Sequence, residues 1–254
     1  MRSRPGRDCT VQFPEIQALA TRLKAHRVLL DGELVHFGVD GTPDFFGIRR
    51  RLIASGHAAA RAAAGVTPAT FVAFDVLHLN GENLRLRAYE ERRARLNELL
   101  GDGPAWRVPR CWTSDHAAVR TAVCSHGLEG VVYKRLDGTY SSSQRTGKWL
   151  KAKNWRREMV AVTAWSPRAP ADRRPHVFYL SRQRADGSVA RAGALECVGA
   201  EKEGELLVQL AIARSMAARA RVRTLDPPIP IEVQCHGGHD WPVREPMLRQ
   251  VLTT

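Results

Sequence analysis

The run from Thr70 to Leu79 is the feature that most restricts how this chain can fold. Its sequence, TFVAFDVLHL, is almost continuously apolar and rich in Phe and Val, and Asn80-Gly81 follows it directly. Such a run is typical of a strand buried in a sheet, and Asn-Gly favours the tight turns that connect strands. We therefore expect a sheet with this strand in its interior and a turn at residues 80–81.

The residues around this strand predict a mixture of helices and strands. Val28–Leu30 and Leu34–Phe37 are apolar runs on either side of Asp31-Gly32-Glu33, which favours a pair of strands there. The Ala-rich run from Ser55 to Thr67 is compatible with either a helix or a loop. The other expected helices are Pro14–His26, Phe45–Ile53, Tyr89–Leu100 and a segment from Ser114 or Asp115 to Gly127, and the other expected strands are Leu128–Arg135 and Lys148–Lys153.

The pattern changes after Trp155. Short strand-like runs at 159–165, 176–180 and 231–234 are separated by turns that contain Pro and Gly, and one helical segment, 205–220, interrupts them. Several short strands with a single helix are typical of a small β-barrel. Two domains are therefore expected, residues 1–155 and residues 156–254, with the boundary near Arg156.

The charge of the chain favours a polyanionic partner. Lys and Arg number 39 against 26 Asp and Glu, a formal net charge of +13. Nucleic acid is the first partner that such an excess attracts and an anionic membrane the second, although an Arg-rich proteome is the plain alternative. Four of the six lysines, Lys134, Lys148, Lys151 and Lys153, fall within twenty residues. This cluster points to a site that needs compact ammonium groups, unless it reflects chance on a solvated strand.

Secreted, membrane and zinc-finger proteins have signatures that this sequence lacks. No run approaches the roughly 18 apolar residues of a membrane span, and the first ten residues contain no apolar signal segment. The five cysteines are widely spaced with no C-x-x-C pair, which favours reduced thiols in the cytosol. Cys235, His236 and His239 lack a second ligand pair at zinc spacing, so we interpret them as a loop.

Five stretches of the sequence occur in the order and at the spacing found in one enzyme family. They are Ser3-Arg4-Pro5-Gly6, Leu30-Asp31-Gly32-Glu33-Leu34-Val35, Phe71-Val72-Ala73-Phe74-Asp75-Val76-Leu77, Leu128-Glu129-Gly130-Val131-Val132-Tyr133-Lys134 and Trp149-Leu150-Lys151-Ala152-Lys153. Each alone is weak, but five in order are specific. The chain resembles the ATP-dependent DNA ligases, within the covalent nucleotidyltransferases that include mRNA capping enzymes. It is most similar to the bacterial stand-alone or end-joining type.

The resemblance implies roles for two carboxylates and one aromatic ring. Glu33 would contact the ribose or a metal ion, and Glu129 would hold the catalytic metal, since carboxylates recur as Mg²⁺ ligands beside a triphosphate. The alternative for either residue is a surface Glu beside a turn. Phe74 would stack on adenine, or else belong to the core, and its neighbour Asp75 is assigned a structural role.

The resemblance also implies roles for three basic residues. Lys151 and Lys153 alternate on one strand, so their ammonium groups point to the same face, where they would bind the α-phosphate and the charge that develops on it. Arg4 would grip the 5′-phosphate of a nick, and the alternative is a flexible terminal Arg.

The fold that the resemblance implies is α+β. A ligase adenylation domain of the nucleotidyltransferase (ATP-grasp-like) type, N-terminally truncated, would be followed by an OB-fold β-barrel. The expected reaction is ATP-dependent sealing of nicks in duplex DNA through lysyl-AMP and DNA-adenylate, with Mg²⁺ or Mn²⁺, in repair or recombination. We expect a monomer in the cytoplasm, associated with the nucleoid and not with a membrane, and a DNA-end-binding protein is a candidate partner. A non-catalytic DNA-binding relic and an RNA ligase or capping-type enzyme are the alternatives.

Two departures from the family pattern bear on activity. The nucleophilic lysine of the family lies in a K-x-D-G-x-R signature that this sequence does not contain, and Lys24 lies on an expected helix in a different context. The 254 residues are therefore expected not to form a covalent AMP adduct, while sealing of a nick that already carries AMP needs no such lysine. Met1 falls inside what resembles the second strand of the family, which suggests a start placed too late. At the other end, Arg244-Glu245-Pro246 and Leu248-Arg249 only partly match the closing R-x-D-K element.

Overall fold

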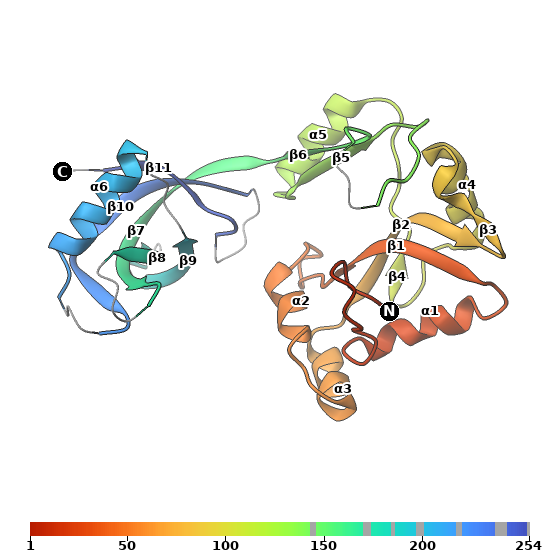
Figure 1. Ribbon diagram of the computed structural model, residues 1–254, viewed down its shortest axis with the longest axis horizontal. Coiled ribbons are helices and arrows are strands. Elements are labelled where there is room, and N and C mark those ends of the chain that lie inside the picture. The colour runs from red at the N-terminus through yellow and green to blue at the C-terminus, as the bar shows by residue number, and fades with distance from the viewer. Residues whose placement is uncertain are drawn as a thin grey trace. The chain divides into compact units, whose positions relative to one another are not determined.

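The computed structural model describes residues 1–142, 146–169, 174–183, 186–196, 201–216, 220–236 and 243–252 (Figure 1). Contacts divide the chain into two compact units. The first contains Met1–Val119 and Val132–Ala152, and the second contains Arg120–Val131 and Lys153–Thr254. The predicted domain boundary near Arg156 stays a prediction, because the units are defined by contacts alone and assign residues 120–131 to the second unit. No helix in the described part of the chain has the length and apolar character needed to cross a membrane.

The first unit is built on a four-stranded sheet in which β2 (Thr70–Leu79) is the common partner. Along one side β2 pairs antiparallel with β1 (Val28–Val35). Along the other side it pairs antiparallel with β3 (Glu82–Asn83) and parallel with β4 (Trp106–Arg107). The turn between β2 and β3 is Asn80-Gly81, with φ angles of 49° and 97°, as the sequence predicts. The interior strand expected at residues 70–79 is therefore confirmed.

The predicted strand pair across residues 28–37 is wrong, because β1 is one continuous strand. Asp31 and Gly32 lie inside it, and the register of pairing shifts between them. A bulge of this kind accommodates a Gly without reversing the chain. Gly32 also lets the Phe71 ring approach the backbone, since a Cβ atom at residue 32 would come within 2.4 Å of Phe71 Cζ. The Asp-Gly pair therefore marks a close approach between neighbouring strands.

Short helices surround this sheet. Apolar residues of α1, β2 and α4 form the larger core of the unit, including the fully buried Ala73, Val76 and Leu96. The helix expected at Pro14–His26 is shorter than predicted and ends at Arg22, whereas the Ala-rich run forms α3. The helical elements of this unit are η1 (Pro14–Ile16), α1 (Gln17–Arg22), α2 (Phe45–Arg51), α3 (His57–Val66), η2 (Leu84–Leu86) and α4 (Tyr89–Leu99).

A helix and a two-stranded sheet carry the last two family motifs. Helix α5 (His116–Ser125) ends before Gly127, whose positive φ of 64° suits a helix C-terminus. Strand β5 (Gly130–Lys134) follows and pairs with β6 (Trp149–Lys153). The strands expected at residues 128–135 and 148–153 are therefore confirmed.

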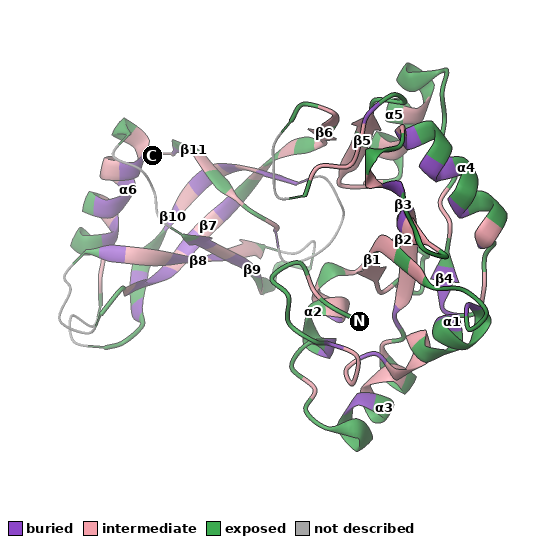
Figure 2. Ribbon diagram, turned by 45° about the vertical axis from the view of Figure 1, so that its right-hand side comes forward, coloured by how far each residue is buried: buried purple, intermediate pink, exposed green. Residues whose placement is uncertain are grey.

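The second unit contains a five-stranded antiparallel sheet in the order β11-β10-β7-β8-β9. Figure 2 shows buried residues along β7, β8 and β10 and on one side of α6, and the core includes Trp165, Phe178, Leu207 and Ile231. The helix predicted over 205–220 begins earlier and ends at Ala213, and residues 217–219 lie outside the described part. The elements are β7 (Trp155–Pro167), β8 (Pro175–Gln183), β9 (Val189–Glu196), α6 (Lys202–Ala213), β10 (Arg223–His236) and β11 (Met247–Val251).

Candidate active site

The acidic motif of β1 lies beside β2. Glu33 pairs with Val72 in the ladder, and its side chain is exposed, with no hydrogen-bond or ion-pair partner among the described residues. Asp31 instead accepts a hydrogen bond of 2.7 Å from the Tyr140 hydroxyl. Burial and this contact raise the pKa of Tyr140 well above its usual value. The two carboxylates of the motif therefore differ, since Asp31 is engaged in the fold and Glu33 is available to a ligand.

Phe74 lies in an aromatic cluster that contains a lysine. Its ring is half-buried and meets Trp149 edge to face, with ring centres 5.9 Å apart. The Lys134 Nζ lies 4.3 Å from the centre of Phe74, 3.9 Å from that of Trp149 and 4.7 Å from that of Tyr89. A cation over aromatic faces is attracted by their negative charge. The motif that supplies Glu129 thus also supplies, five residues later, an ammonium group over the ring expected to stack on adenine.

Lys134 was not assigned a role from the sequence, and its environment is unusual. Its Nζ is buried and has no hydrogen-bond partner among the described residues. Burial lowers the pKa of Lys134 to about 8, against the opposing effect of the nearby Asp75 carboxylate. The clustering of lysines in the sequence pointed to this region, but only the fold brings the three aromatic rings around this amine.

Asp75 has the structural role expected of it. Its two carboxylate oxygens accept hydrogen bonds of 2.8 and 2.9 Å from Arg92 on α4, and both side chains are completely buried. Arg92 also donates to the carbonyl oxygens of Arg87 and Gly138, at 2.7 and 3.0 Å. Gly138 lies in the connection between β5 and β6, so this buried pair ties the central sheet to the segment that joins the last two motifs.

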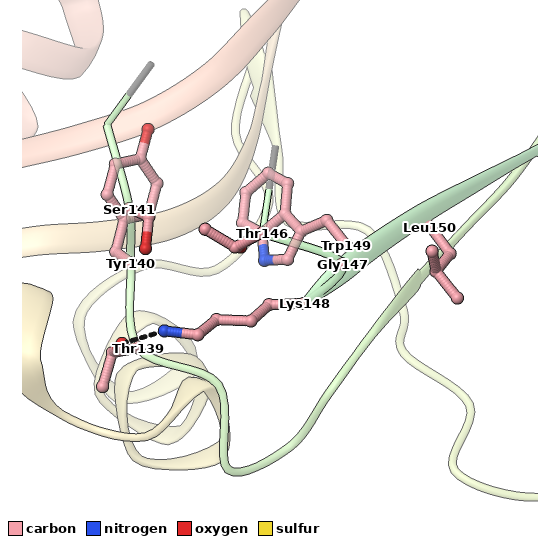
Figure 3. Close-up of a pocket in the computed structure, with 8 residues that line it drawn as sticks. All are labelled: Thr139, Tyr140, Ser141, Thr146, Gly147, Lys148, Trp149 and Leu150. Carbon is pink, nitrogen blue, oxygen red and sulfur yellow. Dashed lines mark hydrogen bonds between the residues drawn. The ribbon is translucent and has the colours of Figure 1, made fainter. Parts of the chain in front are cut away.

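That connection also encloses a pocket of about 420 Å³ (Figure 3). Within it the Lys148 ammonium donates to the Thr139 hydroxyl at 2.5 Å, and the Tyr140 and Trp149 rings meet edge to face with centres 5.8 Å apart. Trp149 thus belongs both to this pocket and to the cluster around Phe74. The pocket is lined by Thr139, Tyr140, Ser141, Thr146, Gly147, Lys148, Trp149 and Leu150.

The second unit holds Lys153 in a polar cluster at the end of β10. The Lys153 Nζ lies 2.7 Å from His236 Nε2 and 3.0 Å from Glu245 Oε2, and that oxygen also lies 2.7 Å from His236 Nε2. The contacts with His236 and Lys153 lower the pKa of Glu245 to about 2. His236 is almost fully buried and stacks on Trp155 at 4.3 Å. Lys153 is therefore held by residues far from it in sequence.

The same unit engages Glu129. Its Oε2 accepts a hydrogen bond of 3.1 Å from Arg244 Nη1, and the two side chains are 29% and 24% exposed. Asn154 fixes the adjoining backbone, since its amide nitrogen donates to Leu128 O and its main-chain N–H to Glu129 O, both at 2.8 Å. Asn154, directly after β6, therefore positions Glu129 directly before β5, and Glu129 has a cation already at its carboxylate.

The remaining predicted residues are exposed. Lys151 lies on β6 with its side chain in solvent contact, and Arg4 lies in a tight turn closed by a hydrogen bond from Gly6 N to Ser3 O. The loop predicted for Cys235, His236 and His239 is wrong for the first two, which end strand β10, and His239 lies outside the described residues. The described residues contain no group of three His, Cys, Asp or Glu side chains able to hold a metal ion. In the first unit lie Glu33, Phe74, Lys151 and Arg4, and in the second lie Glu129 and Lys153.

The segment that contains these site residues matches a known protein family. Residues 1–153 match the family model described as "ATP dependent DNA ligase domain". The chain belongs to the ATP-dependent DNA ligase family. The resemblance that the five motifs indicated is thereby confirmed, and the match includes all six of the site residues predicted above.

The relatives of this chain include proteins named as multifunctional DNA repair proteins. The chain is 35% identical over 165 residues to "Multifunctional non-homologous end joining DNA repair protein LigD" of Mycobacterium tuberculosis, a match that covers 65% of this chain and 20% of that protein. It is 37% identical over 158 residues to a "Probable DNA ligase" of Sorangium cellulosum, covering 61% of this chain and 29% of that one. The chain thus matches only a fifth to a third of the length of these relatives.

Solved structures confirm the expected nucleotidyltransferase fold. The ligase domain of M. tuberculosis LigD superimposes with a TM-score of 0.54 at 27% identity, covering 99% of this chain and 81% of that domain. A mycobacterial DNA ligase D described as complexed with ATP and MES gives a TM-score of 0.57 at the same identity and coverage.

Proposed function

We propose that this chain seals nicks in duplex DNA as an ATP-dependent DNA ligase. The observation that carries the proposal is the match of residues 1–153 to the ligase family, with two motifs on the paired strands β1 and β2 and two at the paired strands β5 and β6. In the reaction of the family, a lysine amine takes AMP from ATP with release of pyrophosphate, a step for which these 254 residues contain no K-x-D-G-x-R signature. The AMP would pass to the 5′-phosphate of the nick, and the 3′-hydroxyl would then attack that phosphate and expel AMP.

The residues of this chain divide these tasks. Lys151 and Lys153 would bind the transferred phosphate and stabilise the negative charge that grows on it. Phe74 would hold adenine through its ring, Glu33 the ribose, and Arg4 the 5′-phosphate of the DNA. Phe74 is half-buried and Glu33 exposed with no partner among the described residues, which supports a role in binding for both.

Glu129 would hold the catalytic Mg²⁺ or Mn²⁺, and contact with a metal ion is the alternative to the ribose for Glu33. The support for a cation at Glu129 is the Arg244 guanidinium that already lies 3.1 Å from its carboxylate. Carboxylate oxygens are the ligands that Mg²⁺ prefers, and a bound divalent ion would neutralise charge on the phosphates.

We further propose that residues 156–254 form an OB-fold. The five antiparallel strands of the second unit and the helix between β9 and β10 support this assignment, since an OB-fold is a partly open five-stranded barrel that binds nucleic acid. The charge of +13 supports contacts made mainly to phosphates. A role in DNA repair or recombination, in the cytoplasm and beside a DNA-end-binding protein, is proposed from the LigD relatives.

Sealing of a nick that already carries 5′-AMP is the direct test. This substrate bypasses the lysyl-AMP step, for which the 254 residues contain no K-x-D-G-x-R signature. We expect sealing in Mg²⁺ of nicked DNA that already carries 5′-AMP, and less sealing of the corresponding nicked RNA or DNA–RNA hybrid. Binding without sealing of any substrate would favour the alternative of a DNA-binding relic, and a preference for nicked RNA would favour an RNA ligase.

A further inference from the structure

Two consecutive residues of opposite charge lie against two oppositely charged groups assigned to catalysis. Arg244 Nη1 is 3.1 Å from Glu129 Oε2, and Glu245 Oε2 is 3.0 Å from Lys153 Nζ. All four residues belong to the second unit. Because Arg244 and Glu245 are neighbours in one segment, the two ion pairs form and break on the same piece of backbone.

Main-chain hydrogen bonds anchor this segment at Val243 and at Arg244. Val243 N donates at 2.8 Å to the carbonyl oxygen of Ala192, which lies within β9, and His236 N donates to Arg244 O at 3.2 Å. Glu245 adopts a positive φ of 45°, a left-handed conformation that costs a non-Gly residue energy. A strained residue persists only where the surroundings hold it, and here the Lys153 and His236 contacts hold its side chain. The geometry is therefore suited to release once a competing group takes these contacts.

The chemistry of each pair resembles that of a ligand. A guanidinium at Glu129 supplies the positive charge that a divalent cation would supply there. A carboxylate at Lys153 supplies the negative charge and acceptor oxygens that a phosphate would supply there. This inference rests on the roles proposed above for Glu129 and Lys153. With those roles, Arg244-Glu245 occupies the metal-binding position at Glu129 and the phosphate-binding position at Lys153 at the same time.

We propose that Arg244 and Glu245 form an internal counterion pair that shields Glu129 and Lys153 until a ligand that carries both a divalent cation and a phosphate replaces it. A phosphate alone must displace Glu245 while Arg244 still holds the segment, and a cation alone must displace Arg244 while Glu245 holds it. Displacement of one residue loosens the other, so the two ligands bind with positive coupling. Arg244 and Glu245 thereby select for a metal–phosphate pair over either component.

Binding of separate probes tests this directly. AMP presents a phosphate and Mn²⁺ a divalent cation, and Mn²⁺ binding can be followed by electron paramagnetic resonance and AMP binding by calorimetry. The variants are Glu245→Gln and Arg244→Gln. The matched controls are Glu232→Gln and Arg157→Gln. Each breaks the partly exposed ion pair of 3.3 Å between these two residues, which lie on β10 and β7. Circular dichroism of each variant establishes that it is folded.

Each partly exposed ion pair should weaken the binding of its competing ligand by about 1.4- to fivefold, which corresponds to the roughly 0.2–1 kcal/mol measured for such pairs. Glu245→Gln should therefore tighten AMP binding, and Arg244→Gln should tighten Mn²⁺ binding, by that factor. In the native chain AMP should tighten Mn²⁺ binding by about threefold, and both variants should lose this coupling. The two controls should bind both probes as the native chain does.

Unchanged or weaker probe binding in the folded variants would overturn the shield, as would failure of every variant to bind either probe. Weaker binding would make Arg244 and Glu245 positioning residues for their partners. The ligase proposal fails on a different measurement, the sealing of pre-adenylated nicks. If the chain seals such nicks but the variants do not bind the probes as expected, the shield alone is refuted. If the variants bind the probes as expected but the chain does not seal such nicks, the ligase reaction is refuted.

Discussion

The buried pair of Asp75 and Arg92 should be among the most costly contacts to break in the first unit. Substituting Asp75→Asn leaves the Arg92 guanidinium buried without a counterion, since both side chains have zero exposure. Breaking one partner of such a pair costs about 3–5 kcal/mol of stability. That is a large part of the roughly 5–15 kcal/mol that stabilises a typical domain.

The double substitution Asp75→Leu with Arg92→Leu should cost less than the sum of the two single substitutions, because no charge is then left alone. It should not be neutral, since the carbonyl oxygens of Arg87 and Gly138 also lose the hydrogen bonds from Arg92. A buried carbonyl without a partner costs about 1–3 kcal/mol. We therefore expect the double variant to remain destabilised by about 2–4 kcal/mol, with a coupling energy of at least about 2 kcal/mol between the two positions.

Equilibrium unfolding in urea measures these values. Tryptophan fluorescence reports on the first unit through Trp106 and Trp149, and a change in midpoint at constant slope reports a change in stability. Glu82→Gln is the control, because its ion pair with Arg87 is about half exposed and should be worth at most about 1 kcal/mol. A loss below about 1 kcal/mol for Asp75→Asn, or additive effects in the double variant, would refute this reasoning.

Four further outcomes follow from the structure and the sequence. Gly32→Ala should lower stability by about 1–3 kcal/mol, because the new Cβ atom would meet the Phe71 ring and the Val72 carbonyl oxygen. Gly65→Ala in α3 should instead raise the melting temperature, because a Cβ atom there meets no neighbouring atom. Burial lowers the pKa of Lys134 to about 8, so between pH 8 and 10 the native state binds fewer protons than the unfolded chain. The free energy of unfolding should therefore rise with pH over this range. Urea titrations at a series of pH values should show this rise in the native chain and not in Lys134→Met. If the chain contacts six or more phosphates, its affinity for nicked DNA should fall by about 10³-fold or more between 50 and 200 mM salt. A filter-binding assay measures this, and an affinity that does not change with salt would contradict DNA as the partner. The 254-residue polypeptide should take no AMP from radiolabelled ATP, and a labelled band on a denaturing gel would show that another lysine serves as nucleophile.

The sequence predicted those elements whose signals are local. The apolar run of β2 with its Asn-Gly turn, the helix α4 and the strands β5 and β6 are recognisable from residues within each element. The same local reasoning failed at Asp31-Gly32, because what decides that position is the Phe71 ring on the neighbouring strand. Turn residues predict a turn only where no partner strand requires a close approach.

The candidate site was predictable where short motifs carry it and not where distant residues complete it. Glu129 and Lys153 stand in motifs, yet their partners Arg244 and Glu245 are more than 90 residues away, and no spacing rule joins them. The aromatic surroundings of Lys134 also come from three separate elements. Such groups are brought together by tertiary packing, which a local pattern does not encode.

The central claim, that Lys151 serves phosphoryl transfer at a DNA nick, is tested most directly by single-turnover sealing of a pre-adenylated nick in Mg²⁺. The comparison is between the native chain, Lys151→Ala and the control Lys24→Ala, which removes an exposed lysine near the end of α1. We expect the native chain and the control to seal at the same rate, and Lys151→Ala, folded and still bound to DNA, to seal at least about 10²-fold more slowly. Sealing by Lys151→Ala at the native rate, or no sealing by a native chain that binds the nick, would contradict the central claim.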